Sequence, residues 1–361
     1  MVRNYRLQLK EEPEEPDKPE VQEEPQGAAK PDDPEEPAES EETKEPENPE
    51  EPVEESEKME QPREQTHRNK MYHAGLVLEG GGMKGFYTAG VLDFFLEQGI
   101  FFSRIYGVSA GACHMTSYLS RQKGRGRDVI MDNVNIRSYC GPLPLFLTGD
   151  FFNVDYAYHL VPDLLNPFDY DTYAAYPGKA YAVVTNIVTG EPEYLEAKDL
   201  RKDMDKIQAS ASLPLISRTV RIGKGRYLDG GISDAIPLQQ SIWDGDEKNI
   251  VVMTKEIGYV RKPESKAALA AIRARYARYP KMYEIMRDRH VTYNQTLDLI
   301  EECEEDGRAF VLRPQHKGEV GRIEKDEEKL MALYNEGYAD AEKKFEAMMA
   351  YLADTEYEEI P

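Results

Sequence analysis

The chain has few cysteines and no long apolar run. Its three cysteines, Cys113, Cys140 and Cys303, are odd in number and show no metal-ligand spacing, so we expect no disulfide framework, no metal site and a reduced compartment. No stretch approaches the roughly 18 apolar residues of a membrane-spanning helix. The first residues include basic side chains but lack the apolar stretch of a secretory signal. These absences predict a cytoplasmic protein.

Acidic charge is concentrated early in the chain. The formal net charge is −23 over 361 residues, and residues 11–60 alone contribute roughly −19. That segment is mostly Glu, Pro and Asp, a composition that cannot bury enough apolar area to offset the entropy lost on ordering. We expect residues 1–68 to form a disordered acidic tail, either solubilising or able to bind a basic partner. We expect no nucleic-acid partner.

The chain does contain two glycine-rich turns that lie one helix apart. Each turn follows a short apolar run typical of a strand, and each precedes a stretch with apolar side chains at helical spacing. The predicted order is strand, glycine turn, helix, strand, glycine turn, helix, over residues 74–78, 80–85, 86–98, 104–108, 107–111 and 110–119. Mixed short strands and helices without a long internal period predict an α/β domain.

The second turn, Gly107-Val108-Ser109-Ala110-Gly111, has the pattern G-x-S-x-G. A serine at such a strand-to-helix corner projects its hydroxyl from the carboxyl edge of the sheet, and Gly107 and Gly111 allow the tight backbone path. The N–H groups that begin the next helix face negative charge that develops there. Ser109 is therefore a candidate nucleophile for acyl transfer.

The first turn can supply an oxyanion hole. Gly80, Gly81 and Gly82 present backbone N–H groups without side chains, a nest that binds anions at the start of a helix. Lys84 lies in the first helical turn, where the helix dipole disfavours a cation. It is either an exposed lysine or a cation that faces an anion or stiffens the loop. Gly85 completes this turn.

A serine nucleophile needs a base. Asp229 follows a predicted strand and precedes Gly230 and Gly231, so its carboxylate has an open approach. The order Ser109, Asp229, His316 is also that of an α/β-hydrolase triad, but such enzymes place several strands before the nucleophile, and only one precedes Ser109. A Ser–Asp dyad fits better. Three other carboxylates stay open as the base on the residues alone, Asp234, Asp244 and Asp246.

Together these motifs resemble the patatin-like phospholipase family, which has G-G-G-x-[R/K]-G, G-x-S-x-G and D-G-[G/A] in this order. The resemblance covers roughly residues 72–259, with Lys84 where many members have arginine. It implies a three-layer α/β/α fold with a mostly parallel central sheet. It also implies hydrolysis of lipid acyl esters without metal or cofactor, through an acyl-enzyme on Ser109 and with Asp229 as base.

The resemblance suggests a catalytic domain over residues 69–262 and a mostly helical extension over residues 263–361 packed on it. Lipid or acyl ester would be the substrate, met peripherally at a membrane surface, with no obligate protein partner. A non-catalytic lipid-binding or scaffold protein on the same fold is the alternative. A nucleotide site is disfavoured, because the first turn reads G-G-G-M-K-G and the next strand ends in G-V-S-A-G rather than in an acidic residue that would bind a ribose.

Three other stretches give weaker expectations. Residues 121–176 look rich in loops but are unusually aromatic, which indicates either core filling or the wall of an apolar cleft. Residues 325–352 predict one long final helix. Arg273, Arg275, Arg278 and Lys281, close to Tyr276 and Tyr279, form either a solvated helix face or a docking patch for anionic headgroups.

Overall fold

The computed structural model describes residues 69–315, 318 and 320–361. All of them belong to one compact unit that includes residues up to Pro361. The predicted acidic tail, residues 1–68, and the alternative base His316 lie outside the described residues.

The unit is built on a nine-stranded sheet with the path β5-β6-β3-β2-β1-β7-β8, while β4 pairs with β3 and β9 pairs with β1. The central pairs are parallel, whereas β4, β5, β6 and β9 join the sheet through antiparallel pairs. The strands are β1 (Asn69–Leu78), β2 (Ile100–Val108), β3 (Lys179–Asn186), β4 (Pro192–Glu196), β5 (Val220–Ile222), β6 (Gly225–Asp229), β7 (Asn249–Val252), β8 (Ala309–Leu312) and β9 (Tyr357–Ile360).

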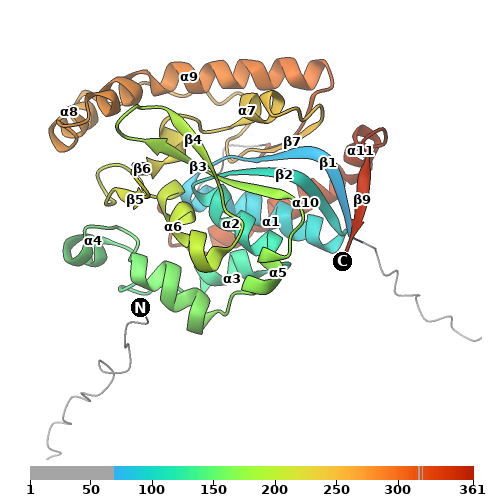
Figure 1. The fold of residues 1–361 in the computed structure, drawn as a ribbon, viewed down its shortest axis with the longest axis horizontal. Coiled ribbons are helices and arrows are strands. Elements are labelled where there is room, and N and C mark those ends of the chain that lie inside the picture. The colour runs from blue at the N-terminus through green and yellow to red at the C-terminus, as the bar shows by residue number, and fades with distance from the viewer. Residues whose placement is uncertain (1–68, 316–317, 319) are drawn as a thin grey trace, which may run out of the picture. The chain divides into compact units, whose positions relative to one another are not determined.

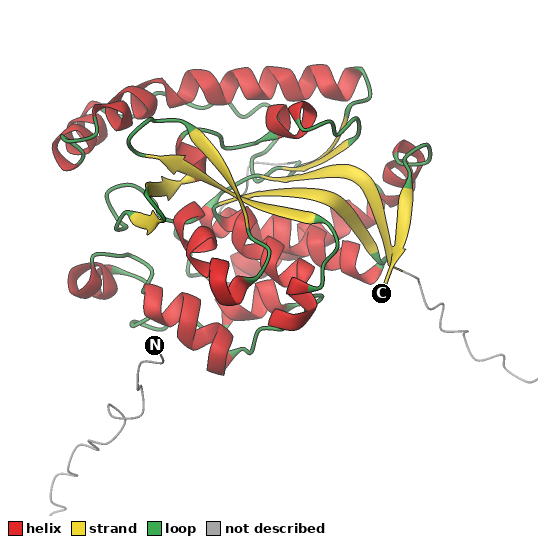
Figure 2. Cartoon of the chain, in the orientation of Figure 1, coloured by secondary structure: helices red, strands yellow, loops and turns green. Residues whose placement is uncertain are grey.

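Helices cover both faces of this sheet, as Figure 1 shows for the labelled elements and Figure 2 for the two helical layers around the strands. One face packs against α1 (Phe86–Glu97), α2 (Ala110–Leu119) and α10 (Glu327–Lys343), the other against α7 (Leu238–Trp243) and α9 (Pro280–Glu305). Leu76 and Leu78 of β1 point into the first core and Val77 into the second. A strand buried on both faces reads as a continuous apolar run. The expected three-layer α/β/α fold is confirmed.

The register places the two glycine turns side by side. Leu78, the last residue of β1, pairs with Gly107 of β2 on one side and with Val252 of β7 on the other. Val108 pairs with Val183 of β3. Since the central strands are parallel, their carboxyl ends lie at the same edge of the sheet, and both turns leave from that edge.

Helix α10 packs on α1 through two glycines. A Cβ on Gly90 would lie 2.0 Å from the carbonyl oxygen of Tyr334, and a Cβ on Gly337 would lie 2.1 Å from that of Tyr87. The hydroxyl of Tyr334 also donates to Asp93 of α1 at 2.6 Å. The backbones approach as closely as glycine allows, so residues of the predicted extension contact the helix that follows the glycine loop.

Two expectations about helices were wrong. The predicted helix over 325–352 is two helices, α10 and α11 (Phe345–Tyr351), separated at Lys344. Residues 121–176 are mainly helical rather than rich in loops. Their helices could not be recognised in the sequence, because they are too short or too irregular to show a 3.6-residue period. They are α3 (Arg125–Met131), α4 (Pro142–Thr148), the π-helix η3 (Tyr156–Leu165), which contains Pro162, and α5 (Tyr170–Ala174).

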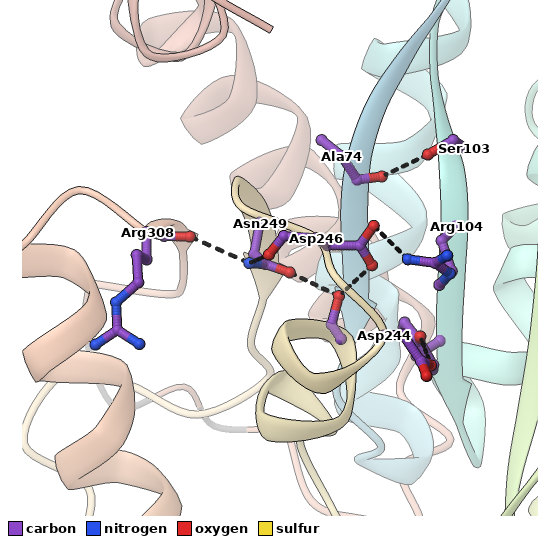
Figure 3. Close-up of polar contacts among 9 residues, drawn as sticks. Ala74, Ser103, Arg104, Asp244, Asp246, Asn249 and Arg308 are labelled. Carbon is purple, nitrogen blue, oxygen red and sulfur yellow. Dashed lines mark hydrogen bonds and ion pairs between the residues drawn. The ribbon is translucent and has the colours of Figure 1, made fainter. Parts of the chain in front are cut away.

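A buried polar cluster ties β2 to the start of β7 (Figure 3). Arg104 Nη1 on β2 lies 2.6 Å from Asp246 Oδ1. Ser241 Oγ contacts Asp246 Oδ2 at 2.8 Å and Asn249 Oδ1 at 2.6 Å. Gly75 is required beside it, since a Cβ there would lie 2.2 Å from Ser241 Oγ. Asn249 begins β7, so this cluster lies toward the amino ends of the strands, away from the glycine turns.

Candidate active site

Ser109 lies at the junction of β2 and α2 in a strained conformation. Its φ is 53° and its ψ −118°, a region that residues with a side chain rarely adopt and that is found at functional sites. Its N–H donates to Ser210 Oγ at 2.9 Å. A Cβ on Gly107 would lie 2.6 Å from Ala112 Cα, and one on Gly111 would lie 2.5 Å from Leu78 O. Both glycines of G-x-S-x-G are therefore required by close backbone contacts.

Asp229 ends β6, and its carboxylate is 2% exposed. Oδ1 accepts a hydrogen bond from Gly231 N at 2.7 Å, whereas Oδ2 is buried and has no hydrogen-bond partner among the described residues. Burial raises the pKa of Asp229, and the Ser109 hydroxyl and the charge of Arg289 oppose that rise. The contact with Ser109 falls outside hydrogen-bond geometry, as catalytic pairs without substrate often do. Asp229 thus lies near the serine and keeps Oδ2 as an acceptor without a partner among the described residues.

The other candidate bases are engaged elsewhere. Asp234 accepts from the Tyr194 hydroxyl at 2.7 Å, and Asp244 accepts from the Tyr106 hydroxyl. Asp246 belongs to the polar cluster at the start of β7. Gly230 lies against β3, since a Cβ there would be 2.2 Å from Val183 O. The Ser109 hydroxyl acts to lower the pKa of Asp229, which places this carboxylate near the serine.

His114 is the histidine of α2, one and a half turns after Ser109. It is 7% exposed, and burial lowers its pKa to about 4. A Cβ on Gly85 would lie 3.2 Å from its Nε2, so the imidazole packs against the first glycine turn. A neutral buried ring in that place is a packing group.

The glycine loop Gly80–Gly82 lies against Ser109. A Cβ on Gly80 would be 3.0 Å from Ser109 Cβ, and Gly82 has a φ of +59°. Two nearby N–H groups are occupied, because Met83 donates to Arg322 O at 3.1 Å and Lys84 to Gly81 O at 3.3 Å. Within residues 69–315, 318 and 320–361, the N–H groups of Gly81 and Gly82 find no acceptor. The N–H groups of Gly81 and Gly82 are therefore free to donate hydrogen bonds to an anion.

A buried carboxylate that the sequence analysis did not identify anchors this loop. Glu79, 2% exposed, accepts from Thr254 N at 2.6 Å and from the Tyr293 hydroxyl at 2.6 Å. The Thr254 hydroxyl in turn contacts Gly80 O at 2.9 Å. A glutamate between an apolar strand and a glycine turn was the available signal, since an almost fully buried acid must be hydrogen-bonded. Its partners, 175 and 214 residues away, have no local signature.

An apolar cavity of about 170 Å³ opens beside Ser109. It lies among α1, α2, α3, η3 and α6 (Leu200–Ser210). Its apolar lining includes Met83, Phe86, Ile130, Val161, Phe168 and Ile207. Part of the aromatic stretch 121–176 therefore forms the wall of a cleft, which was one of the two expectations for it. Such a cavity suits an apolar chain attached to a group at Ser109.

Another part of the same stretch fits neither expectation. Large apolar side chains on α4 and η3 point into solvent; they are Leu143, Phe146, Leu147, Leu160, Leu164 and Leu165. Phe146 is 87% exposed. We call these six side chains the apolar rim, because Val161 and Pro162 on the same π-helix line the cavity. Exposed apolar side chains grouped in this way mark contact surfaces.

The stretch around Arg273, Arg275 and Arg278 is partly internal. Tyr276 is buried, and its hydroxyl accepts from Leu215 N at 3.2 Å. Arg273 lies over the ring of Tyr283, while Arg275 and Arg278 are exposed. Tyr276 thus belongs to a core cluster, and the half-buried Tyr279 packs against it. Over the described residues, no helix is both long and apolar enough to cross a membrane.

Two family models match the chain. The model for patatin-like phospholipases matches residues 76–242, and the model of a domain of unknown function, DUF6363, matches residues 279–353. The uncharacterized protein YjjU of Escherichia coli (strain K12) is 35% identical over 185 residues, 50% of this chain and 51% of that protein. The match therefore spans about half the length of this relative. Ser109, Asp229 and the glycine loop all lie within the range of the first model, so the chain contains a patatin-like phospholipase domain at residues 76–242.

Proposed function

We propose that this protein is a serine hydrolase that cleaves carboxylic esters of lipids through a Ser109–Asp229 dyad. The observation that carries the proposal is the strained Ser109 near the buried Asp229, whose Oδ2 has no partner among the described residues. The apolar cavity at Ser109 supports a fatty acyl group as the part of the substrate that is bound. The patatin-like phospholipase domain supports the same class of reaction.

In the proposed acylation step, Asp229 Oδ2 accepts the proton of Ser109 Oγ as that oxygen attacks the ester carbonyl. The carbonyl oxygen becomes negative and accepts hydrogen bonds from the N–H groups of Gly81 and Gly82. Lys84 adds positive charge to this loop. Collapse of the intermediate breaks the bond to the leaving alcohol, which takes the proton from Asp229. The acyl group is then esterified to Ser109.

Deacylation repeats these roles with water. Asp229 accepts a proton from the water, whose oxygen attacks the acyl-enzyme, and the same N–H groups bind the oxyanion. The proton returns to Ser109 Oγ as the fatty acid leaves. The buried environment that raises the pKa of Asp229 brings it closer to neutral pH, where a general base works best.

The substrate would be met at a lipid surface. The apolar rim lies on α4 and η3, and η3 also lines the cavity, so a rim in contact with lipid would bring an acyl chain near the cavity. We therefore propose peripheral contact with membranes through the apolar rim and chemistry on the cytoplasmic side.

Labelling with a fluorophosphonate tests the nucleophile directly. The wild type should be labelled on Ser109 and should hydrolyse p-nitrophenyl butyrate, while Ser109→Ala should show neither. Ser138→Ala, at an exposed serine outside the cavity, is the matched control and should behave as the wild type. A folded wild-type protein that is neither labelled nor active would favour the non-catalytic lipid-binding or scaffold alternative.

A further inference from the structure

Cations gather beside Asp229, and most of them come from outside the matched patatin range. We define the cation cluster as Lys84, Lys255, Arg261, Arg289 and Arg322. Four of the five follow residue 242, where the family model ends. None of the five lines the apolar cavity. The cluster is therefore a separate feature of the site, on its polar side.

Arg289, on α9, contacts the turn that carries the base. Its Nε donates to Gly231 O at 2.5 Å. A Cβ on Gly231 would lie 3.3 Å from Arg289 Nη2 and 3.0 Å from Asp229 Oδ1, so the guanidinium and the carboxylate flank the same glycine. The Arg289 side chain is 11% exposed. One edge of the guanidinium is used by the turn, and Nη2 lies beside the same glycine as Asp229 Oδ1.

Arg289 and Arg261 share a single carboxylate oxygen. Glu264 Oε1 lies 3.4 Å from Arg261 Nη2 and 3.8 Å from Arg289 Nη1. Arg261 is 7% exposed, and its Nε is buried without a hydrogen-bond partner among the described residues. One carboxylate cannot neutralise two guanidinium groups, and a buried N–H without an acceptor is costly. Both observations leave positive charge and an N–H donor that the described residues do not satisfy.

Arg322 approaches from the loop before α10. Its carbonyl oxygen accepts from Met83 N, which fixes this loop against the glycine turn. The Arg322 side chain is exposed, and no carboxylate of the described residues forms an ion pair with it. Its charge acts on Asp229, Arg289 and Lys255. A solvent-accessible guanidinium thus lies near the mouth of the site.

The cluster has more positive than negative charge. Glu79, Asp229 and Glu264 are the carboxylates that act on it, against five cations. Burial, then the charges of Arg261 and Arg322, lower the pKa of Arg289 to about 9. Burial likewise lowers the pKa of Lys255, with Glu79 opposing and Lys84 contributing. Like charges kept this close destabilise the site unless an anion binds between them.

We infer that the cation cluster, with Arg289 and Arg322 as its donors, binds the phosphate of a glycerophospholipid whose ester lies at Ser109. This rests on the proposed function and specifies its substrate class. Guanidinium groups match the geometry of phosphate oxygens. The apolar cavity and the cluster share no residue, so a lipid with its acyl chain in one and its phosphate at the other would present the intervening ester to Ser109.

Two soluble short-chain lipids that differ in the phosphate test this inference. We expect kcat/KM for 1,2-dihexanoylglycerol-3-phosphate to exceed that for 1,2-dihexanoylglycerol in the wild type. Arg322→Gln should lower this ratio about 10- to 100-fold, the usual effect of losing charge-assisted hydrogen bonds, mainly through KM. Arg289→Lys, which keeps the charge but loses the fork, should lower it less. The matched control is Arg287→Gln on the same helix, which is 52% exposed and paired with Asp288; its ratio should equal that of the wild type.

Each other outcome has a definite meaning. Equal kcat/KM values for the two lipids, or a ratio that Arg322→Gln does not change, would overturn the inference while hydrolysis of both lipids leaves the proposed function intact. Inhibition of dihexanoylglycerol hydrolysis by inorganic phosphate, relieved by Arg322→Gln but without preference between the lipids, would assign the cluster to a free anion and overturn the headgroup assignment. Failure to hydrolyse either lipid or p-nitrophenyl butyrate would instead refute the proposed function.

Discussion

Replacing Ser109 with glycine should abolish activity and yet give a more stable protein than replacing it with alanine. The φ of 53° and ψ of −118° at Ser109 are costly for a residue with a Cβ and easy for glycine. Ser109→Ala is the reference, because both variants lose the hydroxyl and its interaction with Asp229. The difference between the two variants isolates the strain at the turn.

The magnitude follows from opposing contributions. A non-glycine residue in such a region costs about 1–3 kcal/mol, and glycine loses about 0.5–1 kcal/mol more backbone entropy on folding. Ser109 also precedes α2 as its N-cap, where glycine is preferred to alanine by some tenths of a kcal/mol. The net expectation is that Ser109→Gly is about 1 kcal/mol more stable than Ser109→Ala, or about 2–4 °C in Tm for a domain of this size.

Thermal unfolding followed by circular dichroism measures this difference, with p-nitrophenyl butyrate hydrolysis assayed in parallel. Both variants should lose several orders of magnitude in kcat/KM. A Ser109→Gly protein that melts below Ser109→Ala would show that the turn is not strained by its side chain. Activity retained in either variant would remove Ser109 from the chemistry.

Three further predictions concern other parts of the molecule. Asp229→Asn should be nearly as inactive as Ser109→Ala yet melt higher than the wild type. Burial raises the folded pKa of Asp229, so ionisation of this carboxyl destabilises the fold as the pH rises through that pKa. The difference in Tm between the variant and the wild type should therefore widen between pH 4 and pH 8, and a difference that narrows would contradict this. Gly337→Ala should lower stability by about 3 kcal/mol or more, measured by urea unfolding, because its Cβ would lie 2.1 Å from Tyr87 O, whereas exposed Asn335→Ala should have little effect. Phe146→Ser should reduce co-sedimentation with phospholipid vesicles about 10-fold, and the control Val188→Ser, 55% exposed, should not; equal losses in both variants would argue against the apolar rim.

Short-range patterns in the sequence predicted the two glycine-rich turns and the elements around them well. The helix expected over residues 110–119 is α2, and the expected strands before the two glycine turns are the carboxyl ends of β1 and β2. This worked because a G-x-S-x-G turn specifies its own neighbours. Gly107 and Gly111 are required by contacts with residues of the same strand–turn–helix unit and the adjacent strand. Local sequence and tertiary packing impose the same restriction there.

Long-range polar contacts could not be predicted in this way. Arg289 reaches Gly231 from 58 residues away, and Tyr293 reaches Glu79 from 214 residues away. On α9 these side chains are ordinary members of a long helix, and their burial depends on how that helix crosses the sheet. The π-helix η3 was missed for a different reason, because Pro162 within it reads as a helix breaker. The break between α10 and α11 could not be predicted either, because it falls at Lys344 and not at a glycine or proline.

The strand β9 has a consequence for how the protein is made. β1 pairs with β7 along Gly75–Leu78 but with β9 along its first residues, from Asn69 to Tyr72. Asn69 Nδ2 donates to Pro361 O across 292 positions of sequence. On a ribosome, therefore, one edge of the central strand stays unpaired until β9 has been synthesised, long after Ser109 and Asp229 have emerged. An open edge beside an apolar strand invites pairing with other chains. Newly made chains should consequently depend on chaperones until β9 has emerged.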